Sequence, residues 1–171
     1  FYHSVEKGRA KGGAASRRGR GSHRINRRDT ASDWHQGVNI VLCGDLISRE
    51  QFADFELKLD WRISEAGNSG IFIRGDESGR TIHYTGYEMQ VLDNENHPDA
   101  AAGIAGNRQA GALYDLIPAD PQNTKPAGEW NSVEIKVFKG TVWHYQNGEV
   151  VLEYHLWTPE WNELVAGSKF P

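Results

Sequence analysis

Apolar and charged residues alternate without a break from Phe55 to Ile63. Because successive side chains of a β-strand point to opposite faces, this pattern predicts a half-buried antiparallel strand. We expect the apolar face of this strand in a core. Its polar face carries Glu56, Lys58, Asp60 and Arg62.

Two more strands follow, at Ile71 to Arg74 and at Tyr87 to Leu92. The segment from Ser64 to Ser69 reads as a turn, and residues rich in Gly, Asp and Ser separate the two strands. Alternation in all three strands predicts two packed antiparallel sheets. The shared core is expected to contain Leu57, Leu59, Trp61, Ile71, Ile73, Met89 and Val91.

The strand from Tyr87 to Leu92 places Glu88 and Gln90 on the face opposite Met89 and Val91. Their positions lie about 6.6 Å apart, two residues at about 3.3 Å each. A carboxylate beside an amide suits binding, or reacting with, a polyhydroxylated ligand. A structural ion pair between Glu88 and Arg74 on neighbouring strands is the alternative.

The last third of the chain predicts two strands, a tight hairpin and a helix. The strands are Glu134 to Phe138 and Val142 to Tyr145, and Asn147-Gly148 is a strong hairpin signal. Thr158 as N-cap and Pro159 in the first turn open a short helix that stops at Gly167. This helix is expected to bury Trp157, Trp161, Leu164 and Val165. Short strands with a single late helix predict an all-β sandwich of jelly-roll type.

The connection from Asp93 to Gly128 is unusually long and contains one strand-like run, Ala112 to Ile117. Long connections in compact domains often carry function, although any single polar side chain in them is more often a solvated surface group. The connection holds acids, bases and hydrogen-bond donors, namely Asp93, Glu95, His97, Asp99, Arg108, Tyr114, Asp115 and Lys125.

The 171 residues suit one domain, and the 11% aromatic content with six Trp suits an all-β fold. Cys43 is the single cysteine, so an internal disulfide, cysteine catalysis and a cysteine zinc site have no support. No apolar run approaches the ~20 residues of a membrane helix, and no signal-peptide pattern opens the chain.

Charge is concentrated at the N-terminus, where residues 1–28 hold nine of the 19 basic residues and one acid. From Asp29 onward ten basic residues face 22 acidic ones, a net charge of −12. The basic segment fits a solvated, disordered tail better than a nucleic-acid arm, because it has no aromatic side chain on which a base could stack after the first residues. Alternatively, residues 1–43 are not native to the domain and reflect a shifted reading frame.

Four ordered runs carry a resemblance to a known family. They are FADFELKLDWRISEAGNSGIFIRG, TGYEMQVLDNENHPD, AGALYDLIPA and KPAGEWNSVEIKVFKGTVWHYQNGEVVLEYHLWTPEW. Together they resemble the 3-keto-disaccharide hydrolase domain over roughly residues 44–171. The resemblance implies a jelly roll like those of concanavalin A-type lectins and laminarinases. It also implies action on glycosides oxidised to a ketone at carbon 3, in a periplasmic or extracellular bacterial protein.

The chain departs from the family pattern at both ends. Gly44 to Ser48 resembles a GGDLIT-like segment of the family, whereas residues 1–43 do not resemble the segment with which family members usually open. Family members continue past the terminal helix with further strands, so the jelly-roll domain of residues 44–171 is expected to be truncated and to lack its last strands. Any His or Gln that those strands bring to a site is expected to be absent as well.

The chemistry of a 3-keto-glycoside suggests roles for several residues. The ketone acidifies the proton on carbon 2, so a base can form an enolate that expels the aglycone, and water then adds. Glu88 is the candidate base and Arg74 the candidate oxyanion stabiliser, while His97 or Asp93 could protonate the leaving group. Binding of the sugar is assigned to Asn68, Gln90, Asp60 and Tyr114.

A divalent cation could replace Arg74 as stabiliser, because Asp93, Glu95, His97 and Asp99 lie close in sequence. Their spacing matches no recognised ligand pattern, so the metal is left unassigned. No nucleotide cofactor is expected. The expected partner is a carbohydrate or glycoside, without nucleic acid or a membrane span, and the oligomeric state stays undefined.

Two other functions remain open. A non-catalytic, lectin-like carbohydrate-binding domain would also place amides and aromatic rings on a concave sheet. A conventional retaining glycosidase needs two carboxylates ~5–5.5 Å apart across the scissile bond. Two and four residues after Glu88 the sequence has Gln90 and Leu92, so that strand supplies no second carboxylate.

Overall fold

The computed structural model describes residues 25–26, 47–48, 51–75 and 82–170. Strands β1 (Ile25–Asn26) and β2 (Ile47–Ser48) pair antiparallel with each other. The other expectations for residues 1–43 lie outside the described residues.

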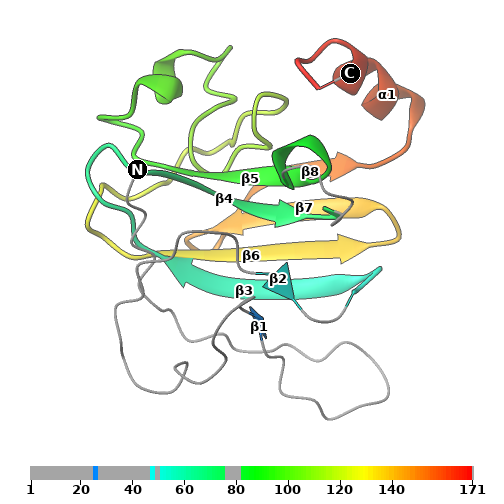
Figure 1. The fold of residues 1–171 in the computed structure, drawn as a ribbon, viewed down its shortest axis with the longest axis horizontal. Helices are drawn as coiled ribbons and strands as arrows, with labels where there is room; N and C mark the ends of the chain where they lie inside the picture. Colours follow the sequence, from blue (N-terminus) through cyan, green and yellow to red (C-terminus); the bar gives the residue numbers. More distant parts are fainter. Residues whose placement is uncertain (1–24, 27–46, 49–50, 76–81, 171) are drawn as a thin grey trace.

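The larger sheet has four antiparallel strands in the order β3, β6, β7 and β8 (Figure 1). These strands are β3 (Phe55–Trp61), β6 (Asn131–Phe138), β7 (Thr141–Gln146) and β8 (Glu149–His155). Asn147 and Gly148 join the last two with φ of 51° and 89°. Positive φ at both turn residues matches the twist of paired strands, so the predicted hairpin is confirmed.

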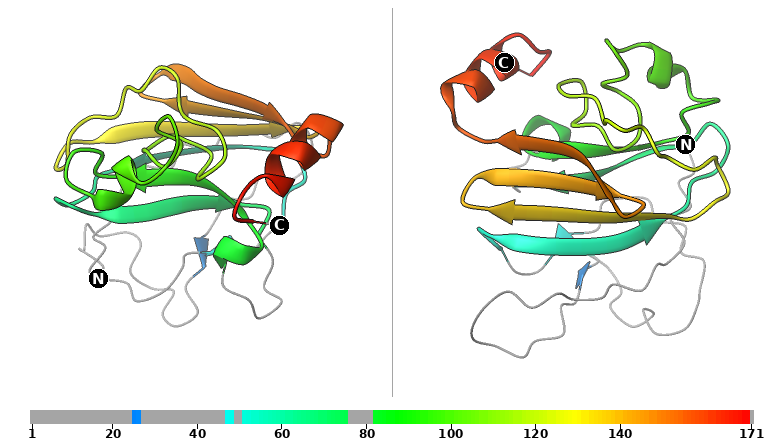
Figure 2. Two further views of the ribbon diagram at one scale, coloured as in Figure 1. Left: turned by 90° about the horizontal axis from the view of Figure 1, so that it is seen from above. Right: turned by 180° about the vertical axis from the view of Figure 1, so that it is seen from behind.

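The smaller sheet pairs β4 (Asn68–Ile73) with β5 (Tyr87–Leu92) and lies against the larger sheet as a second layer (Figure 2, left). The limits of β5 agree with the sequence prediction. Strand β4 begins at Asn68, earlier than predicted, and Arg74 lies beyond its end with φ of 56°. The mostly β architecture with antiparallel sheets is confirmed.

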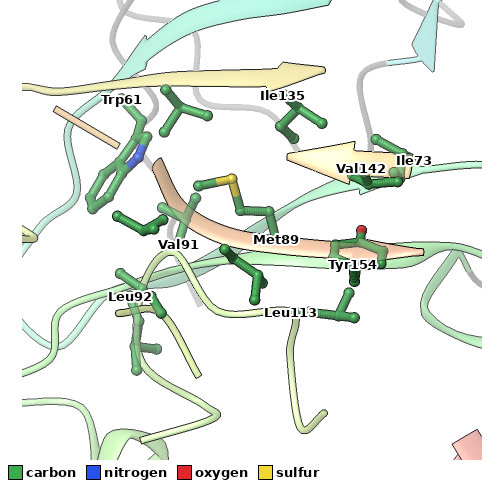
Figure 3. Close-up of a cluster of buried hydrophobic side chains, with 14 of the residues drawn as sticks. Trp61, Ile73, Met89, Val91, Leu92, Leu113, Ile135, Val142 and Tyr154 are labelled. Carbon is green, nitrogen blue, oxygen red and sulfur yellow. The ribbon is translucent and has the colours of Figure 1, made fainter. Parts of the chain in front are cut away.

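The core lies between the two layers (Figure 3). Of the residues predicted for it, Trp61, Ile73, Met89 and Val91 are buried. The remaining three are partly buried and pack against the same cluster, namely Leu57, Leu59 and Ile71. Alternation therefore identified the inward faces of β3, β4 and β5 correctly.

The late helix is α1 (Pro159–Ala166), and the Thr158 hydroxyl caps it by accepting from the Trp161 backbone N–H at 3.1 Å. Trp161 is buried and contacts the rings of Tyr87 and Tyr154, with centroids 5.0 and 5.5 Å away. The prediction that Trp157 is buried was wrong, because its side chain is 60% exposed. Trp157 has a φ of 64°, outside the helical range, so the periodicity of the helix does not extend to it.

Two 3₁₀ turns, η1 (Ile82–Tyr84) and η2 (Pro98–Ala101), flank β5 in the chain. The connection that follows β5 and helix α1 lie at the same end of the molecule (Figure 1, top; Figure 2, right). This arrangement brings the segment after α1 towards β5. Within the described residues, no helix combines the length and the apolar character needed to cross a membrane.

Candidate active site

The outward face of the β4–β5 pair is defined by its register. Phe72 lies opposite Glu88, and Gly70 lies opposite Gln90. Directly opposed residues of an antiparallel pair project to the same face, so these four positions share one surface. Ile71 and Met89 project to the other face, into the core. Core burial of Met89 and Val91 thus fixes Glu88 and Gln90 on the opposite face of β5.

The long connection adds a further edge to this surface. Leu113 forms a bridge with Met89, and the Tyr114 backbone N–H donates to the Glu88 carbonyl at 2.9 Å. The Gln90 backbone N–H donates to the Ala112 carbonyl at 3.0 Å. This local pairing places Tyr114 beside Glu88, on the same face. The strand-like run predicted from Ala112 to Ile117 therefore pairs locally with β5 without forming a strand of its own.

A pocket of about 420 Å³ opens over this surface, within the size range of small-molecule sites. Both sheet strands, η1, the long connection and the segment after α1 contribute to it. The described residues that line it are Asn68, Phe72, Tyr84, Glu88, Gln90, Tyr114, Lys169 and Phe170.

Glu88 is the acidic residue among the described residues that line the pocket. Burial raises the pKa of its carboxyl to about 7, against the lowering effect of Lys169 and with a smaller upward contribution from Asp99. Gly70 makes room for it, since a Cβ at Gly70 would come under 3.0 Å from Glu88 Oε1. A carboxyl with this pKa exchanges a proton readily near neutral pH, which is what a general base requires.

A network of charged groups holds the phenol of Tyr114. Its hydroxyl donates to Asp99 Oδ2 at 2.8 Å and accepts from Lys169 Nζ at 3.2 Å. Arg108 pairs with both Asp99 and Asp115, with 3.0 Å between Nη1 and Asp99 Oδ1. Burial raises the pKa of Asp99, but the bonds from Tyr114 and Arg108 outweigh it, so the net pKa is lowered. Asp99 is therefore ionised and acts as a fixed acceptor for the Tyr114 proton.

A family model described as the 3-keto-alpha-glucoside-1,2-lyase-like domain matches residues 17–169. The chain belongs to this family. The resemblance that the sequence carries is thereby confirmed.

A 3-keto-disaccharide hydrolase of Bacteroides thetaiotaomicron is 52% identical over 137 residues, which are 74% of this chain and 47% of that protein. The chain spans about half the length of this curated relative. Two crystal structures from Parabacteroides distasonis, each provisionally described as a glycosyl hydrolase, are also similar. One has a TM-score of 0.67 and 28% identity, covering 74% of this chain and 63% of that one. The other has a TM-score of 0.56 and 25% identity, covering 63% and 54%.

Four of the site residues predicted from the sequence of this lyase-like domain meet in the pocket: Asn68, Glu88, Gln90 and Tyr114. Gln90 is 1% exposed, and its side-chain Oε1 accepts from the Val91 backbone N–H at 3.1 Å. Its amide NH₂ is a donor for a ligand hydroxyl. Their roles in binding and catalysis are taken up below as proposals.

Arg74 does not line the pocket. Alternation would have placed it beside Phe72, but β4 ends at Ile73 and the positive φ of Arg74 redirects the chain. Its guanidinium lies over the Trp157 ring, 4.8 Å from the centroid, and donates to the Ala53 carbonyl at 3.0 Å. The ion pair between Arg74 and Glu88, the structural alternative that the sequence left open, is absent from the interactions of the described residues for the same reason.

Asp93 and His97 shape the connection after β5 and also lie outside the pocket lining. Asp93 is buried, and its carboxylate accepts from the backbone N–H groups of Ala66, Glu95 and Asn96. Burial alone raises the pKa of Asp93, but the side-chain bond from Asn96 and these backbone bonds lower it overall. His97 Nδ1 accepts from the Asp99 backbone N–H at 3.1 Å and caps η2.

Asp60 belongs to the other layer. It lies on β3 between the inward-facing Leu59 and Trp61, so its side chain projects from the outer face of the four-stranded sheet. The pocket lies over the β4–β5 pair. Asp60 is therefore separated from the pocket by the core.

Among the described residues, no group of three His, Cys, Asp or Glu side chains is arranged to hold a metal ion. The carboxylate oxygens of Asp93 accept local N–H groups, and Asp99 is occupied by Arg108 and Tyr114. Three of the four residues that suggested a cation in the sequence, Asp93, His97 and Asp99, thus have hydrogen-bond partners within the protein.

Sequence reasoning missed half of the pocket lining: Phe72, Tyr84, Lys169 and Phe170. Phe72 could have been found, because alternation places it on the same face as Gly70. No local signal identifies Lys169 and Phe170, since they reach the pocket through the packing of α1 against the end of the sandwich.

Proposed function

We propose that this chain cleaves 3-keto-glycosides by removing the proton on carbon 2, with Glu88 as the base. The observation that carries the proposal is a half-buried carboxyl with a pKa of about 7 in the lining of a sugar-sized pocket. The family match and the 52% identity to a 3-keto-disaccharide hydrolase support this substrate class. We also infer that the two layers form a jelly roll of the concanavalin A-like kind.

The reaction balances in three steps. Glu88 takes the proton from carbon 2, and the C–H electron pair forms the enolate of the 3-ketone. The enolate then forms a double bond between carbons 1 and 2 while the bond from carbon 1 to the aglycone oxygen breaks. That oxygen takes up a proton from the Glu88 carboxylic acid, directly or through water, which returns Glu88 to its carboxylate. Water finally adds its hydroxyl to carbon 1 and a proton to carbon 2, which gives net hydrolysis.

The pocket suits this path better than conventional glycoside hydrolysis. A retaining glycosidase needs a second carboxylate ~5–5.5 Å from the first. Among the described lining residues, Glu88 is the single carboxylate. Asn68 and Gln90 are placed to bond sugar hydroxyls along β4 and β5.

A non-catalytic carbohydrate-binding domain is the second candidate, favoured by Tyr84. This tyrosine lines the pocket and is 69% exposed, and an exposed aromatic ring at a pocket is a surface on which a sugar face can stack. A binding domain does not require a carboxyl with a raised pKa, whereas proton abstraction does. The periplasmic or extracellular location suggested by the family resemblance is retained as part of the proposal.

The test compares nitrophenyl glucosides of both anomers with their 3-keto derivatives, in H₂O and in D₂O. We expect aglycone release from the 3-keto derivatives and none from the unoxidised glucosides. In D₂O the sugar product should carry deuterium at carbon 2. A blank without enzyme measures spontaneous exchange next to the ketone. Release of aglycone without deuterium at carbon 2 would point to direct displacement.

Glu88→Gln keeps the shape of the side chain but removes the base. It should lower kcat by at least ~10²-fold and leave binding of the 3-keto-glycoside nearly unchanged. Glu163→Gln, at an exposed position of α1, is the matched control. Normal turnover by Glu88→Gln would refute the assigned base, and sugar binding without turnover by the unaltered chain would favour the binding domain.

A further inference from the structure

Lys169 is the cationic side chain among the described residues that line the pocket. It lies in the segment after α1, far in sequence from Glu88, and its charge acts on the Glu88 carboxyl. Among the described residues, the pocket lining thus contains one acid and one cation. No other arginine, lysine or histidine of the described part of the chain reaches this lining.

The position of Lys169 is fixed by its surroundings. Gly167 follows α1, and the Ser168 hydroxyl donates to the Val165 carbonyl at 2.7 Å and accepts from the Phe170 backbone N–H at 3.0 Å. The Lys169 ammonium lies over the Tyr114 ring, 4.2 Å from its centroid. Helix α1 itself is held by Trp161 in the core. The backbone around Lys169 and the ammonium group itself therefore both have defined contacts.

Lys169 has more N–H donors than its hydrogen bonds to described residues use. Tyr114 donates its single proton to Asp99, so the phenol has none left for a ligand. Lys169 carries three N–H donors, and one of them goes to the Tyr114 oxygen. The Asp115 carboxylate lies 3.8 Å from Nζ, beyond hydrogen-bond range. Two donors of the ammonium can therefore serve a pocket ligand.

We propose that Lys169 binds the carbon-3 oxygen of the sugar and stabilises the enolate that forms when Glu88 removes the carbon-2 proton. The assignment rests on the proposed function. In this step the C–H pair becomes the double bond between carbons 2 and 3, and the carbonyl pair moves onto oxygen beside the ammonium. When the aglycone leaves, the pair returns from oxygen and the ketone re-forms. A fixed cation at the developing charge lowers the barrier without reorganisation.

Tyr114 and Asp99 act as positioning residues in this scheme. Asp99 holds the Tyr114 proton, which turns the phenol oxygen into an acceptor for Lys169. Arg74, the stabiliser predicted from the sequence, is engaged by Trp157 and Ala53 instead. Lys169 supplies the positive charge that the reaction needs at that point.

Lys169→Met keeps the apolar stem and removes the charge, and Lys169→Arg keeps the charge. Lys139→Met is the matched control, because the Lys139 and Lys169 ammonium groups each lie 5.2 Å from the centroid of a neighbouring phenylalanine ring. We expect Lys169→Met to lower kcat for a 3-keto-glycoside by ~10²–10³-fold, Lys169→Arg to recover part of it, and Lys139→Met to have no effect.

A second readout separates stabilisation of charge from a structural role. Because Lys169 lowers the pKa of Glu88, removing its charge should shift the acid limb of the kcat/KM profile to higher pH. The same shift should appear in an NMR titration of the Glu88 carboxyl carbon, which needs no turnover. Unchanged kcat in Lys169→Met, or a loss without either shift, would overturn the assignment of Lys169. Failure of the unaltered chain to release any aglycone would instead overturn the proposed function.

Discussion

Gly70 leaves the space that the Glu88 carboxylate occupies. Gly70 pairs with Gln90 across the β4–β5 ladder, and the Glu88 side chain leans over it from the neighbouring position. A Cβ on Gly70 would come under 3.0 Å from Glu88 Oε1, closer than real Cβ atoms approach. A glycine inside a strand usually weakens it, so this one is explained by the close approach that it permits.

Gly70→Ala should therefore displace the Glu88 carboxylate. Overpacking of this kind costs about 1–3 kcal/mol of folding free energy, and a shift of about 1 Å in a catalytic group can cost ~10²-fold in rate. Urea unfolding and steady-state kinetics check both effects. Gly167→Ala is the control, because its Cβ would meet neighbours only at 3.5 and 3.7 Å. Normal kinetics in Gly70→Ala would show that the carboxylate has room elsewhere.

The rate of 3-keto-glycoside cleavage should rise with pH, with a midpoint near 7. The base must be ionised to accept the carbon-2 proton, and burial raises the pKa of the Glu88 carboxyl to about 7. A profile of kcat/KM from pH 5 to 9 measures this ionisation in the free enzyme. A midpoint near 4.5, the ordinary value for Glu, would contradict the environment described for Glu88.

Glu88 also has a predictable effect on stability. Between pH 4.5 and about 7 the unfolded chain loses the Glu88 proton while the folded chain keeps it. The folded state then binds more protons, so this group makes the free energy of unfolding fall as the pH rises through that window. Glu88→Gln should remove this pH dependence. Between pH 4 and pH 8, the free energy of unfolding of the variant should therefore rise by on the order of 3 kcal/mol relative to that of the unaltered chain. Urea titrations at the two pH values measure it.

His144 pins the segment that carries Tyr114. It is buried, its Nδ1 lies 3.1 Å from the Gly111 carbonyl, and its Nε2 lies 3.3 Å from the Tyr154 hydroxyl. The neutral ring donates to Gly111 and accepts from Tyr154, which satisfies both nitrogens. His144→Phe should cost about 1–3 kcal/mol, because it leaves buried polar groups without partners. Tyr154→Phe removes only the second bond and should cost less.

The pH dependence of the His144 contribution has the opposite sign to that of Glu88. Burial lowers the pKa of His144 to about 4, so between pH 6.5 and 4 the unfolded chain takes up a proton that the folded chain refuses. Stability from this group is therefore lost as the pH falls through that window. The free energy of unfolding is best measured as a function of pH in the Glu88→Gln variant, because the opposite pH dependence caused by Glu88 is absent there. If His144→Phe in that variant lost as much unfolding free energy on acidification as the chain with His144, the buried, neutral state of His144 would be refuted.

Tyr114→Phe tests the positioning of Lys169. The variant keeps the ring under the ammonium but removes both the bond to Asp99 and the acceptor for Lys169. We expect kcat to fall ~10-fold, less than for loss of the cation itself, because the charge stays near the pocket. Steady-state kinetics measures the fall in kcat, and circular dichroism shows whether the variant is still folded. An effect as large as that of Lys169→Met would assign the phenol a direct role in the reaction.

Arg74→Ala should leave turnover within a few-fold of normal. The side chain contacts Trp157 and Ala53 outside the pocket, so its loss removes a cation–π contact and one hydrogen bond. These contacts together amount to about 1–2 kcal/mol of stability. Thermal unfolding and kinetics in parallel check the expectation. A loss of turnover with stability retained would restore Arg74 as a candidate stabiliser.

The sequence by itself determined the strands and the inward face of the core. Alternation in β3 and β5 is long and regular, and burial of Trp61, Met89 and Val91 leaves only one face for Glu88 and Gln90. Asn147-Gly148 and Thr158-Pro159 were equally readable, because turns and helix caps depend on the local backbone. Glu88, the central residue of the site, was therefore within reach of local reasoning.

Tertiary structure decided which distant side chains meet Glu88. Alternation failed for Arg74 at the end of β4, where a single positive φ turns the chain away. Asp93 and His97 looked like reactive groups, yet their oxygens and nitrogen satisfy backbone donors of the connection that contains them. Lys169 had no local signature, because its place in the pocket follows from the burial of Trp161 and the docking of α1. Local periodicity specifies faces, whereas the meeting of segments far apart in sequence is set by how the core packs.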